Sequence, residues 1–391
     1  DKKQPEAASY RYRFEVPESW GERRIELVFD GVMTDAEVRL NGELAGPSHQ
    51  GGFYRFRFDV TELMEVPGPN LLEVEVREAS ADRSVNRAER DADYWVFGGI
   101  FRPVWLEAFP AESIREVAID ARADGGLVTE VQLDGIAATR RLLAQVLDDR
   151  GEPVGEPFSA TAEPGAARTR LETSLSSVRP WTAETPHLYR LAVCLEPLPT
   201  VDNRPGDSAE SCGLGEILTD RLHQISERFG FRTVELRPGE GFFINGKKVL
   251  LKGINRHSFW PSSGRTTSPG ISRQDVRLMK EMNLNAVRLS HYPPDSHFLD
   301  TADEIGLYVL DELAGWKDAY DTEVGRPLVE SMVRRDRNHP SIIAWNNGNE
   351  GGWNEELDAV FTAHDPQGRP VLHPRSEEPF SGLNTWHYRS Y

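Results

Sequence analysis

A glutamate and an asparagine, Glu350 and Asn349, follow shortly after an apolar stretch at residues 341–345. Pro340 precedes this stretch and a cluster of asparagine and glycine follows it, which predicts a short strand buried on both faces, as in a parallel sheet. In barrel enzymes the loops after such strands converge on one pocket, so Glu350 is a candidate general acid or base. The alternative is that the pair belongs to an ordinary loop or to the start of a helix.

Other polar side chains follow the neighbouring predicted strands. His257 comes shortly after a strand predicted at residues 249–253, and Arg288 and His291 lie at the end of one predicted at 286–289. An imidazole can donate or accept a hydrogen bond to a hydroxyl group, and a guanidinium stabilises a nearby carboxylate. A lone histidine is more often a surface residue, and Arg288 could also form an ion pair inside a barrel. Two histidines at successive strand ends favour a binding site.

Aromatic side chains near predicted strand ends could stack on the apolar face of a sugar ring. These tryptophans are Trp316, Trp353 and Trp386, and His387 follows the last of them. We count all four residues among the predicted substrate contacts. For each tryptophan, packing in the interior is an equally good explanation.

Composition narrows the class of protein. The 391 residues predict two or three domains, and 38% hydrophobic with 28% charged residues is typical of a soluble globular chain. No apolar run approaches the ~20 residues that cross a membrane. A net charge of −18 would repel nucleic acid and suits a neutral substrate such as a sugar. No signal segment is recognisable, and the compartment stays open.

The pattern of elements predicts three parts. Residues 1–109 show short alternating strands around the hairpin signal Asn41-Gly42, and residues 110–236 show further short strands at the spacing of an immunoglobulin-like sandwich. The tract 197–215, rich in proline, glycine and serine, is a long connection to which we assign no function. Cys194 and Cys212 could pair or remain free thiols.

Residues 237–391 change to strands that alternate with helices, the pattern of a (β/α) barrel. Ser272 and Asp275 predict a capping box at the start of the first helix, Asp295 begins the second, and Gly306 ends it. The expected strands lie at residues 249–253, 286–289, 307–310, 342–345, 370–372 and 383–386. Six strands are fewer than the eight of a closed barrel, so we expect the barrel to continue beyond Tyr391 and this segment not to fold alone.

The stretch at residues 337–350, RNHPSIIAWNNGNE, resembles glycoside hydrolase family 2, which contains β-galactosidases, β-glucuronidases and β-mannosidases. Further similar stretches are Val-Arg-Leu-Asn-Gly at 38–42, Gly-Ile-Phe-Arg at 99–102 and the Pro-Trp…Leu-Tyr segment at 180–189. The resemblance implies a jelly-roll sandwich, an immunoglobulin-like sandwich and a TIM barrel. It also implies a retaining exo-β-glycosidase, with the β-galactosidases as the most similar members.

The resemblance assigns roles to individual residues. Glu350 would be the acid/base, the nucleophilic glutamate would lie beyond Tyr391, and Asp311 and Glu312 would brace the site. No Mg²⁺ is expected, because Gly-Trp-Lys-Asp at 315–318 stands where the magnesium-dependent members have ligands, and no other cofactor is implied. The predicted substrate contacts are Asp93, His257, Arg288, His291, Asn349, Trp316, Trp353, Trp386 and His387.

The expected partner is an oligosaccharide or another glycoside, with no nucleic acid and no membrane, and a homo-oligomer is left open. His49 is a weaker candidate for substrate contact, because it could equally be a solvated loop histidine. The alternatives are a β-glucuronidase or β-mannosidase of the same family, or a carbohydrate-binding protein without turnover.

Overall fold

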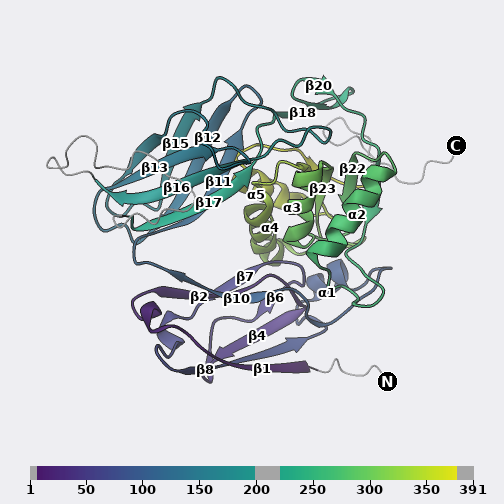
Figure 1. Cartoon of the computed structure of the whole chain (residues 1–391). Coiled ribbons are helices and arrows are strands. Elements are labelled where there is room, and N and C mark those ends of the chain that lie inside the picture. Colours follow the sequence, from purple (N-terminus) through teal and green to yellow (C-terminus); the bar gives the residue numbers. More distant parts are fainter. Residues whose placement is uncertain (1–6, 199–220, 377–391) are drawn as a thin grey trace.

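A computed structural model describes residues 7–198 and 221–376, which form two β-sandwiches and an α/β part (Figure 1). The first sandwich (purple to blue) lies below the other two parts in this view. Within the described residues, no helix is both long and apolar enough to cross a membrane.

The first sandwich has two main sheets, ordered β1-β8-β4-β5, with β6 paired to β4, and β10-β2-β7, while β3 pairs with β9. Asn41 and Gly42, both with positive φ, make the predicted hairpin between β4 and β5. The strands are β1 (Ala7–Glu15), β2 (Arg24–Phe29), β3 (Val32–Met33), β4 (Asp35–Leu40), β5 (Glu43–Leu44), β6 (His49–Gln50), β7 (Phe56–Asp59), β8 (Pro69–Arg77), β9 (Gly99–Ile100) and β10 (Val104–Phe109).

A helix inside this sandwich was missed by the sequence analysis. Residues Arg83–Glu89 form α1, and the Asp82 side chain accepts hydrogen bonds from the backbone N–H groups of Ser84 and Val85. Short 3-10 turns lie at Glu18–Trp20 and Thr61–Leu63. An aspartate cap at one short turn is a weak signal in a segment dominated by strand patterns, so the prediction of strands alone for residues 1–109 was wrong at this helix.

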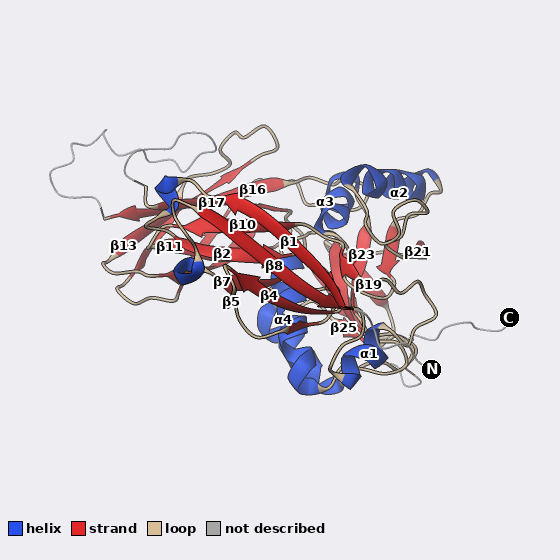
Figure 2. Cartoon of the chain, turned by 90° about the horizontal axis from the view of Figure 1, so that it is seen from below, coloured by secondary structure: helices blue, strands red, loops and turns tan. Residues whose placement is uncertain are grey.

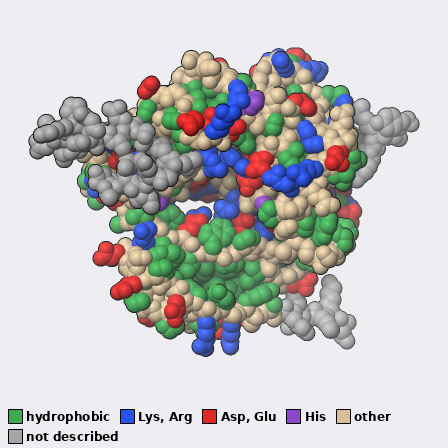
Figure 3. Space-filling model, in the orientation of Figure 1, with side chains coloured by type: hydrophobic (Ala, Val, Ile, Leu, Met, Phe, Trp, Pro, Cys, Tyr) green, Lys and Arg blue, Asp and Glu red, His purple; other side chains and the backbone are tan. Residues whose placement is uncertain are grey.

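The sandwich is open along one edge. A groove of about 620 Å³ lies between β1 and β10, lined by apolar side chains that include Tyr12, Phe14 and Leu106. Figure 3 shows hydrophobic side chains gathered on this part of the molecule. Both bordering strands end their sheets, so the inner faces of the two sheets meet solvent there.

The second sandwich packs a three-stranded sheet, β11-β12-β15, against a four-stranded one, β14-β13-β16-β17. The runs predicted from the sequence at 114–119, 127–133, 142–147 and 188–195 form β11, β12, β13 and β16, with ends that differ by at most two residues. The disulfide-bonded Cys194 is buried in β16, and Cys212 lies outside the described residues. The strands are β11 (Ser113–Ala121), β12 (Gly126–Asp134), β13 (Arg140–Leu147), β14 (Phe158–Ala162), β15 (Arg168–Ser174), β16 (Tyr189–Pro197) and β17 (His223–Phe229).

The α/β part begins with the antiparallel sheet β18-β19-β20 and continues as five parallel strands in chain order, β21 to β25. Helices connect the parallel strands, as in the wall of a (β/α) barrel. The strands are β18 (Val234–Arg237), β19 (Gly241–Ile244), β20 (Lys247–Lys248), β21 (Gly253–Arg256), β22 (Ala286–Leu289), β23 (Tyr308–Leu313), β24 (Ile342–Asn347) and β25 (Val371–Leu372). The helices are α2 (Pro269–Glu281), α3 (Ser296–Ile305), α4 (Thr322–Asp336) and α5 (Asp358–His364), with a 3-10 turn at Glu355–Leu357.

Two local predictions for this part were wrong. The first parallel strand is β21 rather than 249–253, because its register is set by pairing of Gly253 with Ala286. The first helix is capped by Ser268, whose side chain accepts from the Ile271 N–H, and Ser272 lies inside the helix. The end of α3 at Gly306, with φ of 91°, was predicted correctly. The predicted strand at 383–386 lies outside the described residues.

The first sandwich and the α/β part share one hydrophobic core. Phe53, Tyr54 and Val85 of the sandwich belong to the same buried cluster as Tyr292 and Leu328 of the α/β part. In Figure 2, α1 lies beside the α/β part. The loop after α1 is therefore placed against the ends of the parallel strands.

Candidate active site

Side chains from three neighbouring strands converge at the carboxyl end of the parallel sheet. Arg288, at the end of β22, donates from Nε to Glu312 Oε2 at 2.6 Å and from Nη2 to Asn349 Oδ1 at 2.7 Å. Glu312 Oε2 also accepts from Asn346 Nδ2 at 2.9 Å, and Glu312 Oε1 lies 2.7 Å from His291 Nδ1. The structure thus brings together three of the predicted contacts, namely Arg288, His291 and Asn349.

Glu312 fixes the protonation of its neighbours. Burial alone would raise its pKa, but Arg288 and His291 outweigh burial and lower it, so the carboxylate is ionised. An ionised carboxylate only accepts, so His291 Nδ1 carries a proton and donates it to Glu312. The 3.5 Å contact between Arg288 Nη2 and His291 Nδ1 is then not a hydrogen bond. In this tautomer His291 Nε2 carries a lone pair, which can accept a hydrogen bond from a ligand.

Asn349 is almost completely buried, with 1% of its surface exposed. Its side-chain oxygen faces Arg288, and among the described residues its Nδ2 has no hydrogen-bond acceptor. A buried amide donor without an acceptor costs free energy unless a ligand or water satisfies it. This arrangement suits a residue that donates to a substrate hydroxyl.

Glu350 lies in a tight turn formed by residues 348–352. Its φ of 49° is in the left-handed region, where residues other than glycine are uncommon and functional residues are enriched. A Cβ at Gly348 would lie 1.8 Å from the Gly352 carbonyl oxygen, so only glycine fits there. Arg375 Nη1 stands 3.7 Å from Glu350 Oε2. The turn therefore holds the Glu350 carboxylate beside a cation, directly after the buried Asn349.

His257 lies on the loop after β21, close to His291. Its Nδ1 is 3.2 Å from the Tyr292 hydroxyl, and the two imidazole rings are 5.4 Å apart. Burial, His291 and Arg265 lower the pKa of His257 to about 4. It is therefore neutral at pH 7 and can either donate to or accept from a hydroxyl.

An aromatic wall from the first sandwich borders these histidines. Tyr94 is buried, with ring centroids 5.3 Å from His257, 6.3 Å from His291 and 5.9 Å from Trp316. The sequence analysis missed Tyr94, although it follows the predicted contact Asp93 directly. A large aromatic residue next to a suspected ligand residue was the available signal.

The remaining predicted contacts lie at different depths. Asp93 is exposed on the loop before β9, and its contact with sugar stays a prediction. Trp316 is half-buried against His291, whereas Trp353 stacks on His373 at 5.4 Å. Trp386 and His387 lie outside the described residues.

Two further residues singled out in the sequence face away from the site. His49 stacks on Phe56 and bonds to the Gly51 carbonyl oxygen, within the sandwich. Asp311 is next to Glu312 on β23, so its side chain points to the opposite face, where it meets Asp336. Asp336 is paired with Arg335. Burial and Asp336 raise the pKa of Asp311, so Asp311 is the protonated member of the two aspartates. The bracing role expected for Glu312 agrees with its position, and Asp311 is a structural residue.

A polar relay joins the first sandwich to the loop that carries Trp316. The Tyr320 hydroxyl donates to Glu89 Oε1 at 2.6 Å and lies 3.0 Å from the Tyr54 hydroxyl, which accepts from the Ala314 N–H at 3.1 Å. The Gly52 N–H donates to Glu89 Oε2 at 2.8 Å. The relay fixes both ends of the loop between β23 and α4.

The relay predicts a pH effect on stability. Burial raises the pKa of Glu89 from 4.5 to about 7 against the opposing hydrogen bonds from Tyr320 and Gly52. A raised pKa gives stability that is fully present below pH 4.5 and lost as pH rises through 7. We expect urea unfolding to show that the free energy of unfolding of Glu89→Gln, relative to that of the native protein, rises by about 3 kcal/mol between pH 4.5 and pH 8. Glu43→Gln, at an exposed strand position, is the control. A difference in unfolding free energy between Glu89→Gln and the native protein that stays constant across this pH range would contradict the raised pKa of Glu89.

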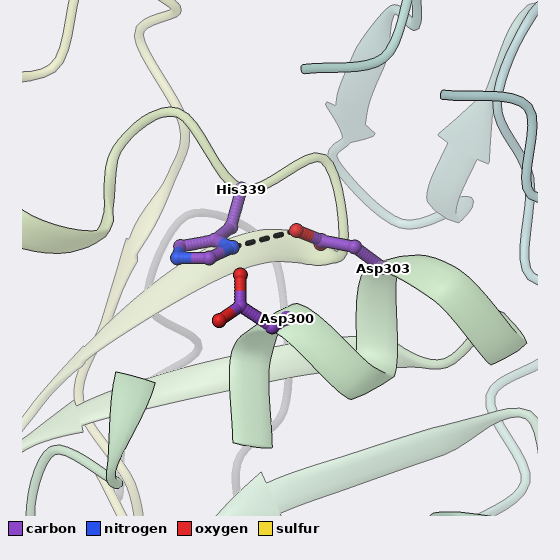
Figure 4. A group of neighbouring side chains, drawn as sticks. All are labelled: Asp300, Asp303 and His339. Carbon is purple, nitrogen blue, oxygen red and sulfur yellow. Dashed lines mark hydrogen bonds and ion pairs between the residues drawn. The ribbon is translucent and has the colours of Figure 1, made fainter. Parts of the chain in front are cut away.

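One group of described residues has the types and spacing of metal ligands, namely Asp300, Asp303 and His339 (Figure 4). His339 Nδ1 donates to Asp303 Oδ2 at 2.6 Å, and Arg228 Nη2 lies 2.5 Å from Asp300 Oδ1. The pKa of His339 is raised, because Asp303 outweighs burial. A protonated histidine and an arginine repel a metal cation. Asp300, Asp303 and His339 therefore form an ion-pair cluster at the amino end of β24.

His339 gives a second pH prediction. Its raised pKa contributes stability that is fully present below pH 6.5 and lost as pH rises through the higher folded value. His339→Asn keeps an N–H donor without the charge, so its deficit in unfolding free energy should be larger at pH 5.5 than at pH 9. The control His187→Asn removes a histidine whose pKa is lowered by burial and Arg179, and it should not show this loss. Equal deficits of His339→Asn at both pH values would argue for an uncharged histidine.

Two known domain families match stretches of this chain. The domain description "Glycosyl hydrolases family 2, TIM barrel domain" matches residues 234–376, and "Glycosyl hydrolase 2 galactose-binding domain-like" matches residues 3–118. Two sandwiches and a parallel sheet with these strand-end residues define a multidomain glycoside hydrolase architecture. The chain belongs to glycoside hydrolase family 2.

The relatives include enzymes for two kinds of sugar. The β-galactosidase of Arthrobacter sp. strain B7 is 35% identical over 93% of this chain, and that of Thermoanaerobacter pseudethanolicus is 32% identical over 86%. The β-glucuronidase of Bacteroides uniformis superposes with a TM-score of 0.80 at 25% identity, covering 95% of this chain and 46% of its own. The chain spans 34% and 44% of the length of the two β-galactosidases.

Proposed function

We propose that the protein is a retaining exo-β-glycosidase that removes terminal β-galactosyl residues, with Glu350 as acid/base. The supporting observation is Glu350 in a constrained turn next to Asn349, beside the network of Arg288, Glu312 and His291. In this reaction an acid protonates the leaving oxygen while a second carboxylate attacks the anomeric carbon from ~5–5.5 Å away. Water then releases the sugar, with the first carboxylate acting as base.

The nucleophile in this proposal comes from outside the described residues. Glu312 is the buried carboxylate of the network, but its two oxygens already accept three hydrogen bonds. Its low pKa and full burial suit a residue that orients Arg288 and His291 rather than one that attacks substrate. Arg288 would in turn stabilise a neighbouring anionic nucleophile.

The sugar would be held by groups that recognise hydroxyls. Asn349 Nδ2 would donate to the 2-hydroxyl, a contact that strengthens in the transition state. His291 Nε2 and the neutral His257 would contact other hydroxyls, and Asp93 would accept from one on the open side. A neutral galactoside suits this set, because the half-buried Arg288 is already paired with Glu312.

A panel of nitrophenyl β-glycosides tests this function. We expect release of nitrophenol from the galactoside well above that from the glucuronide and the mannoside. The glucuronide is the second candidate, since a putative β-glucuronidase of Formosa agariphila is 31% identical over 84% of this chain. Release from the glucuronide or mannoside alone would reject the galactoside. Binding of sugar without any release would support a carbohydrate-binding protein.

A further inference from the structure

An aromatic platform lies on the rim of the candidate site. Trp95 stacks on Phe259 with ring centroids 4.0 Å apart and an interplanar angle of 9°, and Phe97 lies 6.4 Å from Phe259 at 24°. Trp95 is 55% exposed. Among the described residues, no other tryptophan or phenylalanine is exposed to this extent. A stacked tryptophan with a free face is costly to leave in water unless something covers it.

The platform is held rigidly by two arginines. Arg265 Nη2 donates to the Trp95 carbonyl oxygen at 2.7 Å, and Arg90 Nη1 donates to the Phe97 carbonyl oxygen at 2.9 Å. Arg265 is 3% exposed, and its guanidinium carbon lies 4.3 Å from the ring centroid of Tyr292. Because the loop is fixed in advance, a ligand that stacks on Trp95 has little ordering entropy to lose.

The chain neighbours of the platform lead directly into the site. Tyr94 precedes Trp95 and packs its ring against His257, whereas Trp95 points outward. Phe259 comes two residues after His257 on the loop that follows β21. The platform and the sugar-binding histidines are therefore carried by the same two segments, with the platform on the solvent side.

We propose that the face formed by Trp95 and Phe259 binds the leaving group of the glycoside, as a subsite for a ring with an apolar face, either an aryl group or the next sugar. This inference rests on the proposed function, because an exo-acting enzyme buries the terminal sugar and leaves the group on its anomeric oxygen directed to the rim. Stacking on an aromatic plane suits either kind of ring, since both present apolar C–H or π surface. Direct polar contacts to the leaving group are not required.

Binding of methyl and phenyl glycosides, measured by calorimetry with the sugar that the nitrophenyl panel selects, tests the subsite. The native protein should prefer the phenyl glycoside. Trp95→Ala should weaken phenyl glycoside binding by about 3- to 10-fold and leave the methyl glycoside within about 2-fold, in line with the size of aromatic pair energies. Trp95→Phe should restore most of the preference. Tyr12→Ala, which removes an exposed ring in the groove of the first sandwich, is the matched control.

Each outcome has a distinct meaning. If Trp95→Ala keeps the native preference for the phenyl glycoside, or weakens both ligands equally, the subsite is rejected. If the native protein itself shows no preference, another segment covers Trp95 and the subsite is also rejected. Failure of the proposed function is different, since the native protein would then release no nitrophenol from the galactoside of the panel.

Discussion

Replacing Glu350 with glutamine is expected to reduce kcat/KM for substrates with poor leaving groups, such as disaccharides, by roughly 10²–10⁴-fold. Glutamine fills the same space but cannot donate a proton to the departing oxygen. Dinitrophenyl glycosides need little protonation, so their glycosylation step should be affected far less. The measurement is the dependence of kcat/KM on the pKa of the leaving group, which should become much steeper in the variant.

The matched control for this experiment is Glu355→Gln, an exposed glutamate five residues further along the chain. This control should leave the dependence on leaving group unchanged. Equal losses of Glu350→Gln on activated and unactivated substrates would point to a role in binding or folding. In that case another carboxylate would be the acid.

The elements that were predicted correctly depend on local pattern. The run at 286–289 forms β22 with these bounds, and 342–345 forms most of β24, because each is a short, largely buried strand between turn residues. Polar residues that follow such strands share one edge of a parallel sheet. For this reason the grouping of Arg288, His291 and Asn349 could be predicted from the sequence.

The features that were missed depend on contacts between distant segments. The hydrogen bond of Tyr320 to Glu89 joins residues 231 positions apart, and Tyr94 reaches His257 across the boundary between two parts of the fold. The strand shift to β21 has the same origin, since pairing with β22 overrides the apolar run at 249–251. Local periodicity carries no information on such pairings.

The largest expected effect on stability comes from Arg288. In Arg288→Met the Glu312 carboxylate, with 0% of its side chain exposed, keeps His291 and Asn346 as partners but loses its guanidinium. Breaking a buried ion pair on one side typically costs about 3–5 kcal/mol. Urea unfolding should show a loss of this size, and activity should disappear because Asn349 loses the donor that orients it.

The double variant Arg288→Met/Glu312→Gln separates charge from positioning. With no ionised carboxylate left unpaired, we expect it to regain most of the lost free energy of unfolding, which gives a large interaction term in a double-mutant cycle. Activity should not return, because neither the orientation of Asn349 nor the proton on His291 Nδ1 is restored. Arg288→Lys is the intermediate case, with the charge retained but without the planar fork that reaches Glu312 and Asn349 together. If the double variant is as unstable as Arg288→Met, the packing volume of Arg288 rather than its charge holds this end of the sheet.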